Sequence, residues 1–82
     1  MNQPKLFGKR VRTIRKAARI TQEKAAEAAH LNSKYLGEIE RGEKRPSFDA
    51  ILALGKALNV SAATFFQFER EENYEKILRR KI

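Results

Sequence analysis

The side chains best suited to binding chemistry share one side of a short predicted helix. Ser33, Lys34 and Glu38 lie away from the apolar face that Leu36 and Ile39, three residues apart, are expected to bury. A hydroxyl, an ammonium group and a carboxylate supply donors and acceptors for the edges of nucleic acid bases. Lys34 could donate to guanine, Ser33 to almost any base or to a phosphate, and Glu38 could accept from cytosine. Glu38 could instead orient Lys34, which lies four residues before it.

Positive charge follows this helix directly and also marks the start of the chain. Arg41, Lys44 and Arg45 form one basic cluster, and a second cluster lies within residues 5–19. The net charge of +8 over 82 residues indicates a polyanionic partner. The alternative is a solvated basic surface, but two clusters flanking one polar helix favour nucleic acid. Tyr35 could reach a phosphate or sugar with its hydroxyl, or pack its ring against the first helix.

Two helices joined by a tight turn would hold these side chains in place. Thr21 can cap a helix over residues 22–29, and Asn32 can cap the next helix over residues 33–41. The first of these helices is rich in alanine, whose small side chain lets a neighbouring helix axis come close. Two helices joined in this way form a helix-turn-helix, whose second helix lies in a DNA major groove.

Apolar residues at helical spacing predict three further helices. After a loose start over residues 1–4, the first helix is expected over residues 5–18. Ser47 is expected to cap a fourth helix, which follows a loop containing proline. Ser61 is expected to cap a fifth helix over residues 62–66.

These helices carry nearly all the apolar residues, and no strand-like alternation or internal repeat interrupts them. Residues 1–66 are therefore expected to form one compact, all-α domain of five helices. The tail, residues 67–82, has apolar residues at helical offsets and acidic residues before basic ones, which suits the dipole of a sixth helix. The alternative for the tail is a frayed, charged segment.

Four segments carry a resemblance to a known family. They are FGKRVRTIRKAARI, TQEKAAEAA, LNSKYLGEIERG and RPSFDAILALGKALNVS, which together cover most of residues 7–66. In this order and spacing they resemble the XRE, or Cro/C1-type, helix-turn-helix regulators. The resemblance implies a lambda-repressor-like fold, double-stranded DNA as the partner, and control of transcription as a repressor or activator. The tail that follows Phe65 and Phe66 makes the chain look similar to the controller proteins of restriction-modification systems.

The resemblance also implies roles for single residues. Relatives contact a phosphate through a glutamine at the position of Gln22, read bases from the polar face described above, and cross the phosphate backbone with the basic cluster that follows it. Arg15 and Glu40 match positions that form an ion pair between the first and third helices of several relatives. Arg19 and His30 stand where relatives usually have glycine, so the turns at these positions are expected to be slightly altered.

A domain of this size buries too little surface to bind a single half-site tightly. The sequence therefore predicts a symmetric homodimer on a pseudo-palindromic operator. The predicted interface consists of the aromatic and aliphatic residues Phe65, Phe66, Phe68, Tyr74, Ile77 and Leu78. The competing interpretation for the first two is packing within the core of their own subunit.

No residue pattern in the sequence favours catalysis, a metal site or a cofactor. Cysteine is absent, the lone His30 cannot build a metal site, and no nucleophile-base set or glycine-rich phosphate cradle is present. No apolar run approaches the ~20 residues needed to span a bilayer, and no signal peptide is recognisable. A cytoplasmic, non-enzymatic protein without membrane contact is expected. Two alternatives are an antitoxin or other protein-interaction module with secondary DNA binding, and membrane-surface binding through the basic first helix.

Overall fold

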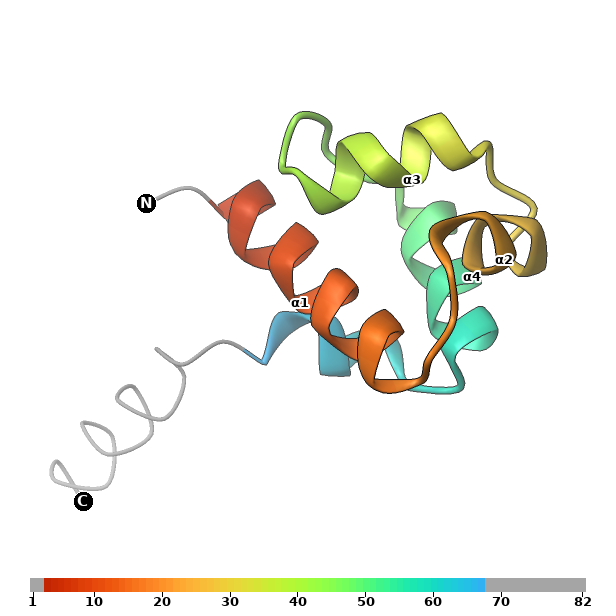
Figure 1. Ribbon diagram of the computed structural model, residues 1–82. Helices are drawn as coiled ribbons and strands as arrows, with labels where there is room; N and C mark the ends of the chain where they lie inside the picture. The colour runs from red at the N-terminus through yellow and green to blue at the C-terminus, as the bar shows by residue number, and fades with distance from the viewer. Residues whose placement is uncertain (1–2, 68–82) are drawn as a thin grey trace, which may run out of the picture.

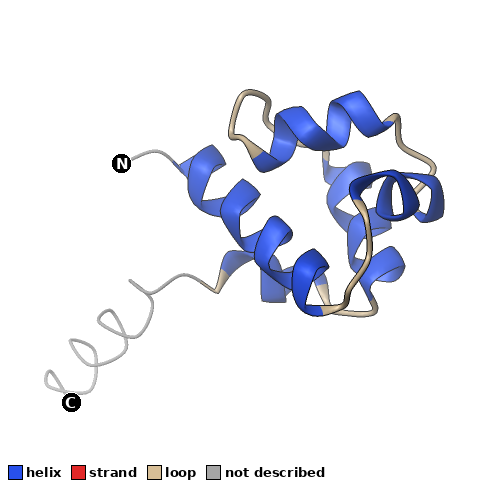
Figure 2. Ribbon diagram, viewed as in Figure 1, coloured by secondary structure: helices blue, strands red, loops and turns tan. Residues whose placement is uncertain are grey.

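The fold is built from helices alone in the part of the chain that the structure describes. The computed structural model describes residues 3–67. These residues form four α-helices and a short 3₁₀ helix, namely α1 (Gln3–Ala17), α2 (Gln22–Ala28), α3 (Ser33–Glu40), α4 (Phe48–Leu58) and η1 (Ala62–Phe66) (Figure 1). No strand occurs within residues 3–67 (Figure 2). The predicted all-α class is therefore confirmed.

The last described element differs from the predicted fifth α-helix. η1 is a 3₁₀ helix of five residues, a form that proteins use in short pieces because its hydrogen-bond geometry is poorer. The predicted cap at its start is wrong, because the Ser61 hydroxyl lies 3.1 Å from the Thr64 hydroxyl and caps no backbone N–H. The sixth helix predicted for the tail falls outside the described residues.

The start of α1 also differs from the prediction. The helix begins at Gln3, so Pro4 lies in its first turn instead of in a loose segment. Proline is tolerated there because the first backbone N–H groups of a helix have no intrahelical partner, and its ring presets a helical φ. Gly8, one turn further on, lets α1 approach α3 closely, because a Cβ at this position would overlap the carbonyl oxygens of Ile39 and Glu40.

The predicted caps of the three remaining α-helices are confirmed. Thr21 Oγ1 accepts from the backbone N–H of Lys24 at 3.1 Å, and Asn32 Oδ1 accepts from that of Lys34 at 2.7 Å. Ser47 Oγ accepts from the third residue of α4 at 3.0 Å. Each cap satisfies a backbone donor that the helix itself leaves unpaired, so the start of α3 is held in register with the turn before it.

The core lies between the helices and includes a residue that was predicted for the dimer interface. Leu36 and Ile39 of α3, Leu54 of α4 and Phe65 of η1 are completely buried. The ring of Phe65 meets that of Phe7 edge to face, with 5.7 Å between the ring centroids. The assignment of Phe65 to a dimer interface is therefore wrong, because its side chain is already enclosed by its own subunit, as the competing interpretation held.

The helix ends keep a left-handed residue even where the sequence has no glycine. Arg19, His30 and Asn59 have φ values of 59°, 56° and 57°, and Gly42 has 75°. At each end, the N–H that follows the left-handed residue donates to the carbonyl five positions earlier, at 2.8–3.2 Å, which is a Schellman motif. The predicted alteration of the turns at Arg19 and His30 is therefore wrong. Their backbone bonds hold the geometry that glycine would adopt without strain.

Candidate nucleic-acid interface

The polar face of α3 is open to solvent while its opposite face is fixed in the core. α3 lies along one edge of the molecule, and a tight turn joins it to α2 (Figure 1). Ser33 and Lys34 are exposed at its start, whereas Leu36 and Ile39 are completely buried. The buried pair sets the rotation of the helix about its axis, so the first turn of α3 presents its polar side chains outward.

The loop that follows α3 lies beside the N-terminal end of α1 (Figure 1). A Cβ at Gly42 would overlap the backbone and side chain of Lys5, so the two segments are in close contact. The fold thus brings the basic start of α1 next to the basic cluster of Arg41, Lys44 and Arg45 at the end of α3. Lys5 and the basic cluster that follows α3 therefore lie side by side at the candidate interface, although they are far apart in the sequence.

The predicted ion pair between Arg15 of α1 and Glu40 of α3 is present and buried. Arg15 Nε donates to Glu40 Oε2 at 2.7 Å, and Arg15 Nη2 donates to Oε1 at 3.0 Å. Arg15 and Glu40 are 8% and 7% exposed, and Nη1 donates to the carbonyl of Ile20 at 2.8 Å. The hydrogen bond with Glu40 raises the pKa of Arg15 above its ordinary value, so the guanidinium stays charged.

Gln22, the predicted phosphate ligand, is connected to this ion pair. Its Nε2 donates to Glu40 Oε1 at 3.1 Å, the same oxygen that accepts from Arg15 Nη2. Gln22 is the first residue of α2 and is half-buried. The orientation of its amide therefore depends on an element of the core, which the sequence prediction did not include.

Tyr35 packs its ring against the core, and its hydroxyl can still donate a hydrogen bond. Its half-buried ring packs against the core cluster, and its hydroxyl oxygen accepts from the backbone N–H of Ser47 at 3.1 Å. This bond ties α3 to the start of α4 across the basic loop. The phenolic proton remains as a donor, because a tyrosine hydroxyl can donate and accept at once.

Carboxylates pair with two of the three basic side chains of the loop. Arg41 Nε and Nη2 donate to the two carboxylate oxygens of Glu43 at 2.9 and 3.2 Å, and this bond lowers the pKa of Glu43. Lys44 Nζ lies 3.5 Å from Glu38 Oε1, and the Glu38 side chain is 18% exposed. Glu38 thus pairs with Lys44 across the loop, and not with Lys34 as the alternative interpretation held. Arg45 is exposed.

The predicted dimer interface is described only in part. Phe66 is 41% exposed, and its ring lies against Phe7 with 5.1 Å between the centroids. The other residues predicted for this interface, Phe68, Tyr74, Ile77 and Leu78, lie outside the described residues. Sequence reasoning missed Phe48 and Leu52, which are 74% and 43% exposed. They lie one turn apart on α4, and the signal that could have found them is two large apolar residues outside the buried stripe of that helix.

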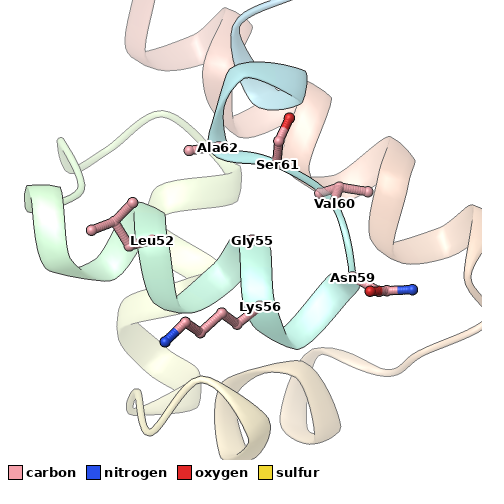
Figure 3. A pocket seen from close by; sticks show the side chains of 7 residues that line it. All are labelled: Leu52, Gly55, Lys56, Asn59, Val60, Ser61 and Ala62. Atoms are coloured by element: carbon pink, nitrogen blue, oxygen red, sulfur yellow. The ribbon is translucent and has the colours of Figure 1, made fainter.

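An open hollow borders Leu52 between the second half of α4 and the start of η1 (Figure 3). Gly55 and Val60 line it, and Lys56 extends from the same helix with its amine away from the turn. Gly55 is needed because a Cβ there would lie 2.9 Å from the carbonyl oxygen of Val60. The hollow therefore lies where the segment after α4 passes close to the helix at Gly55.

Two further properties concern the same described range. Residues 3–67 contain no group of three or more histidines, aspartates or glutamates placed to hold a metal ion. Among the helices of this range, none combines the length and apolar character needed to cross a membrane.

Comparison with known proteins identifies the family. Residues 6–65 match the family described as a helix-turn-helix domain. The HTH-type transcriptional regulator YazB of Bacillus subtilis is 40% identical over 60 residues, which are 73% of this chain and 87% of that protein. Control protein C.BamHI of Bacillus amyloliquefaciens is 38% identical over 71 residues, which are 85% of this chain and 88% of that protein. The chain spans 42% or less of the length of three other relatives.

A solved structure supports the same assignment. The restriction-modification controller protein C.AhdI from Aeromonas hydrophila matches with a TM-score of 0.79 and 33% identity, covering 80% of this chain and 100% of that one. The geometry of α2 and α3, the match over residues 6–65 and these relatives agree. The chain belongs to the XRE, or Cro/C1-type, helix-turn-helix family of DNA-binding transcriptional regulators.

Proposed function

We propose that the protein binds a pseudo-palindromic operator as a homodimer, with α3 of each subunit in the major groove of one half-site. The observation that carries this proposal is the division of α3 between two environments. Leu36 and Ile39 are completely buried, while Ser33 and Lys34 project from the exposed first turn. A helix fixed in this way can enter a groove without rearrangement of the domain.

Ser33 and Lys34 are the proposed principal base-reading residues. Both are exposed, and both precede the buried part of α3, as expected for a recognition helix that reads bases from its N-terminal half. Glu38 is a third candidate, since its carboxylate could accept from a cytosine amino group. It also pairs with Lys44, so its contact with a base would depend on the position of that lysine.

The proposed phosphate ligands surround these base-reading residues. They are Gln22, Tyr35, Arg41, Lys44 and Arg45. Lys44 is exposed and lies 3.5 Å from the less exposed carboxylate of Glu38. Arg41 pairs with the exposed carboxylate of Glu43, and an exposed ion pair of this kind contributes little stability. A DNA phosphate can therefore replace the carboxylate at small cost, and it releases counterions from the DNA as it does so.

The homodimer rests on apolar surface that one subunit leaves uncovered. Phe66 is partly exposed where the tail begins, and we propose that Phe66, Phe68, Tyr74, Ile77 and Leu78 meet the same residues of a second copy. The half-sites would lie about one helical turn of DNA apart, which places both recognition helices on the same face of the duplex. The likeness to proteins named as control proteins makes the promoters of restriction-modification genes the first natural targets to test.

Selection of bound DNA from a random duplex pool tests this proposal. We expect enrichment of a two-fold symmetric site and, by sedimentation with the purified site, a complex of two subunits per duplex. Retention that disappears with salt and enriches no sequence would contradict it, because phosphate contacts alone carry no sequence information. Enrichment of an asymmetric site bound by one subunit would contradict the homodimer but keep the recognition helix.

A further inference from the structure

An ion pair between Glu38 and Lys44 closes the far end of the polar face of α3. Glu38 lies one turn after Lys34 on this helix, and residues four positions apart share a helix face. Lys44 lies in the loop that follows α3, and its Nζ is 3.5 Å from Glu38 Oε1. The one acidic side chain among the proposed base-reading residues is therefore paired with a cation from outside the helix.

The backbone of the loop places Lys44 beside Glu38. The backbone N–H groups of Glu43 and Lys44 donate to the carbonyl oxygen of Glu38 at 2.8 and 3.4 Å, and Gly42, with a φ of 75°, turns the chain back toward the helix. These contacts involve no side-chain atom of Lys44. A substitution at this position can therefore remove the ammonium group while the loop keeps its course.

The pairing leaves Lys34 free. Glu38 and Lys34 are four positions apart, and opposite charges at this spacing attract each other on a helix surface. Within residues 3–67, however, no carboxylate forms an ion pair with Lys34, and its side chain is exposed. The Lys34 ammonium thus keeps its N–H donors for a ligand.

Without Lys44, the Glu38 carboxylate would compete with DNA for Lys34. DNA phosphates repel a carboxylate, and the nearest remaining cation on the same helix face attracts it. A Lys34 ammonium bound to Glu38 would donate to that carboxylate in place of the N7 and O6 acceptors of guanine. The ammonium of Lys44 has several N–H donors, so it can face Glu38 and a DNA phosphate at once.

We propose that Lys44 is a positioning residue for base recognition, which holds the Glu38 carboxylate at the loop end of α3 and so keeps the Lys34 ammonium available to guanine. The inference rests on the proposed operator binding and deepens it, because it names a loop residue that determines base preference without touching the base. This role is added to the phosphate contact proposed for Lys44, which by itself carries no sequence information.

The substitution Lys44→Ala tests this role on the operator selected from the duplex pool. Selection with Lys34→Ala identifies the base pair that Lys34 reads. The preference is then the ratio of the dissociation constants for the operator and for a duplex in which this base pair is exchanged. We expect Lys44→Ala to reduce the ratio about two- to fivefold, because Glu38 turns toward Lys34.

Arg45→Ala is the matched control. It removes a neighbouring cation of the same loop, and within residues 3–67 no carboxylate forms an ion pair with Arg45. Its loss should weaken binding to both duplexes alike, because a phosphate contact does not depend on the base. A Lys44→Ala variant that behaves in the same way, with the ratio of the wild type, would overturn the inference.

A second substitution shows whether the effect passes through Glu38. Glu38→Gln in the Lys44→Ala background keeps the shape of the side chain and removes the charge that competes for Lys34. The preference at the base pair read by Lys34 should therefore return to the ratio of the wild type. A double variant that keeps the reduced ratio of Lys44→Ala would contradict the proposed role.

Failure of the proposed function gives a different result. If the wild-type protein selects no DNA sequence, operator binding fails and this inference falls with it. If the protein selects an operator and Lys34→Ala has the same base preferences as the wild type, operator binding stands and the role of Lys44 is overturned.

Discussion

Arg15 of α1 and Glu40 of α3 form a bidentate ion pair that joins the first helix to the recognition helix. The Nε to Oε2 distance is 2.7 Å, both residues are buried, and the carbonyl of Ile20 and the amide of Gln22 complete the hydrogen bonds of the pair. No buried side-chain nitrogen or oxygen within the described residues lacks a partner. A pair that is fully hydrogen-bonded in this way is costly to break from one side only.

Removal of one partner of this ion pair should therefore strongly destabilise the domain. We expect Arg15→Ala and Glu40→Ala each to lower the free energy of unfolding by about 3–5 kcal/mol, because each leaves a buried charge without its partner. Chemical denaturation followed by circular dichroism measures the change. Glu43→Ala is the matched control, since it removes the carboxylate of an exposed pair, and its denaturation midpoint should stay close to that of the wild type. An equal loss of stability in all three variants would contradict the distinction between the buried and the exposed ion pair.

Glycine at Arg19 or His30 should stabilise the protein. Both residues have positive φ, a conformation that costs a residue with a Cβ about 1–2 kcal/mol, whereas glycine adopts it without steric cost. Part of this gain is offset because glycine has more conformational freedom in the unfolded chain. We therefore expect Arg19→Gly and His30→Gly each to raise the free energy of unfolding by about 0.5–1 kcal/mol. Thermal and chemical denaturation provide the measurement. Arg12→Gly, in the middle of α1, should instead lower the free energy of unfolding by about 1 kcal/mol. A gain in stability for this variant would contradict the explanation.

A methyl group at Gly8 should disrupt the contact between α1 and α3. The Cβ of Gly8→Ala would overlap the carbonyl oxygens of Ile39 and Glu40, and backbone atoms cannot turn aside as side chains can. We expect the free energy of unfolding to fall by about 1–3 kcal/mol or more, although alanine has a better helix propensity than glycine. Denaturant titration gives the comparison with Gly37→Ala, where the atoms nearest to an added Cβ belong to side chains. Equal stability of the two would mean that α1 and α3 can separate at no cost.

The acidity of Glu43 should depend on Arg41. The hydrogen bond from Arg41 lowers the pKa of the Glu43 carboxyl below its ordinary value. A depressed pKa means that the pair contributes its small stability above the unfolded-state pKa and loses it as the pH falls through the folded-state pKa. Carboxyl titration by NMR should show the Glu43 pKa returning toward its ordinary value in Arg41→Ala. If the pKa stays low without the arginine, another donor holds the carboxylate.

Lys34 should carry base preference and not general affinity. Lys34→Ala is expected to relax the preference at one position of each half-site, at a cost of about 1–3 kcal/mol for the preferred base. Repeating the duplex selection with the variant measures the change. Lys56→Ala serves as the control, because it removes the same charge from a helix outside the proposed reading face. A uniform loss of affinity over all sequences would reassign Lys34 to a phosphate.

Local features of this protein could be predicted from sequence because their causes lie within a few residues. Thr21, Asn32 and Ser47 cap helices through bonds to N–H groups two or three positions away, and the buried face of α3 follows from the spacing of Leu36 and Ile39. The pairing of Arg15 with Glu40 spans 25 positions and was predictable only through the family resemblance.

Tertiary structure decided the features whose partners lie far apart in the chain. The bond between Gln22 and Glu40 spans 18 positions, so the sequence could name Gln22 but not the group that orients its amide. Phe65 is buried because α1 and α4 enclose η1, although its type and position suited an interface equally well. Arg19 and His30 adopt the backbone of glycine because the hydrogen bonds and packing that close each helix outweigh the local steric cost. Local rules determined where the helices begin and which faces they bury, and the packing of distant segments determined how the candidate binding groups are held.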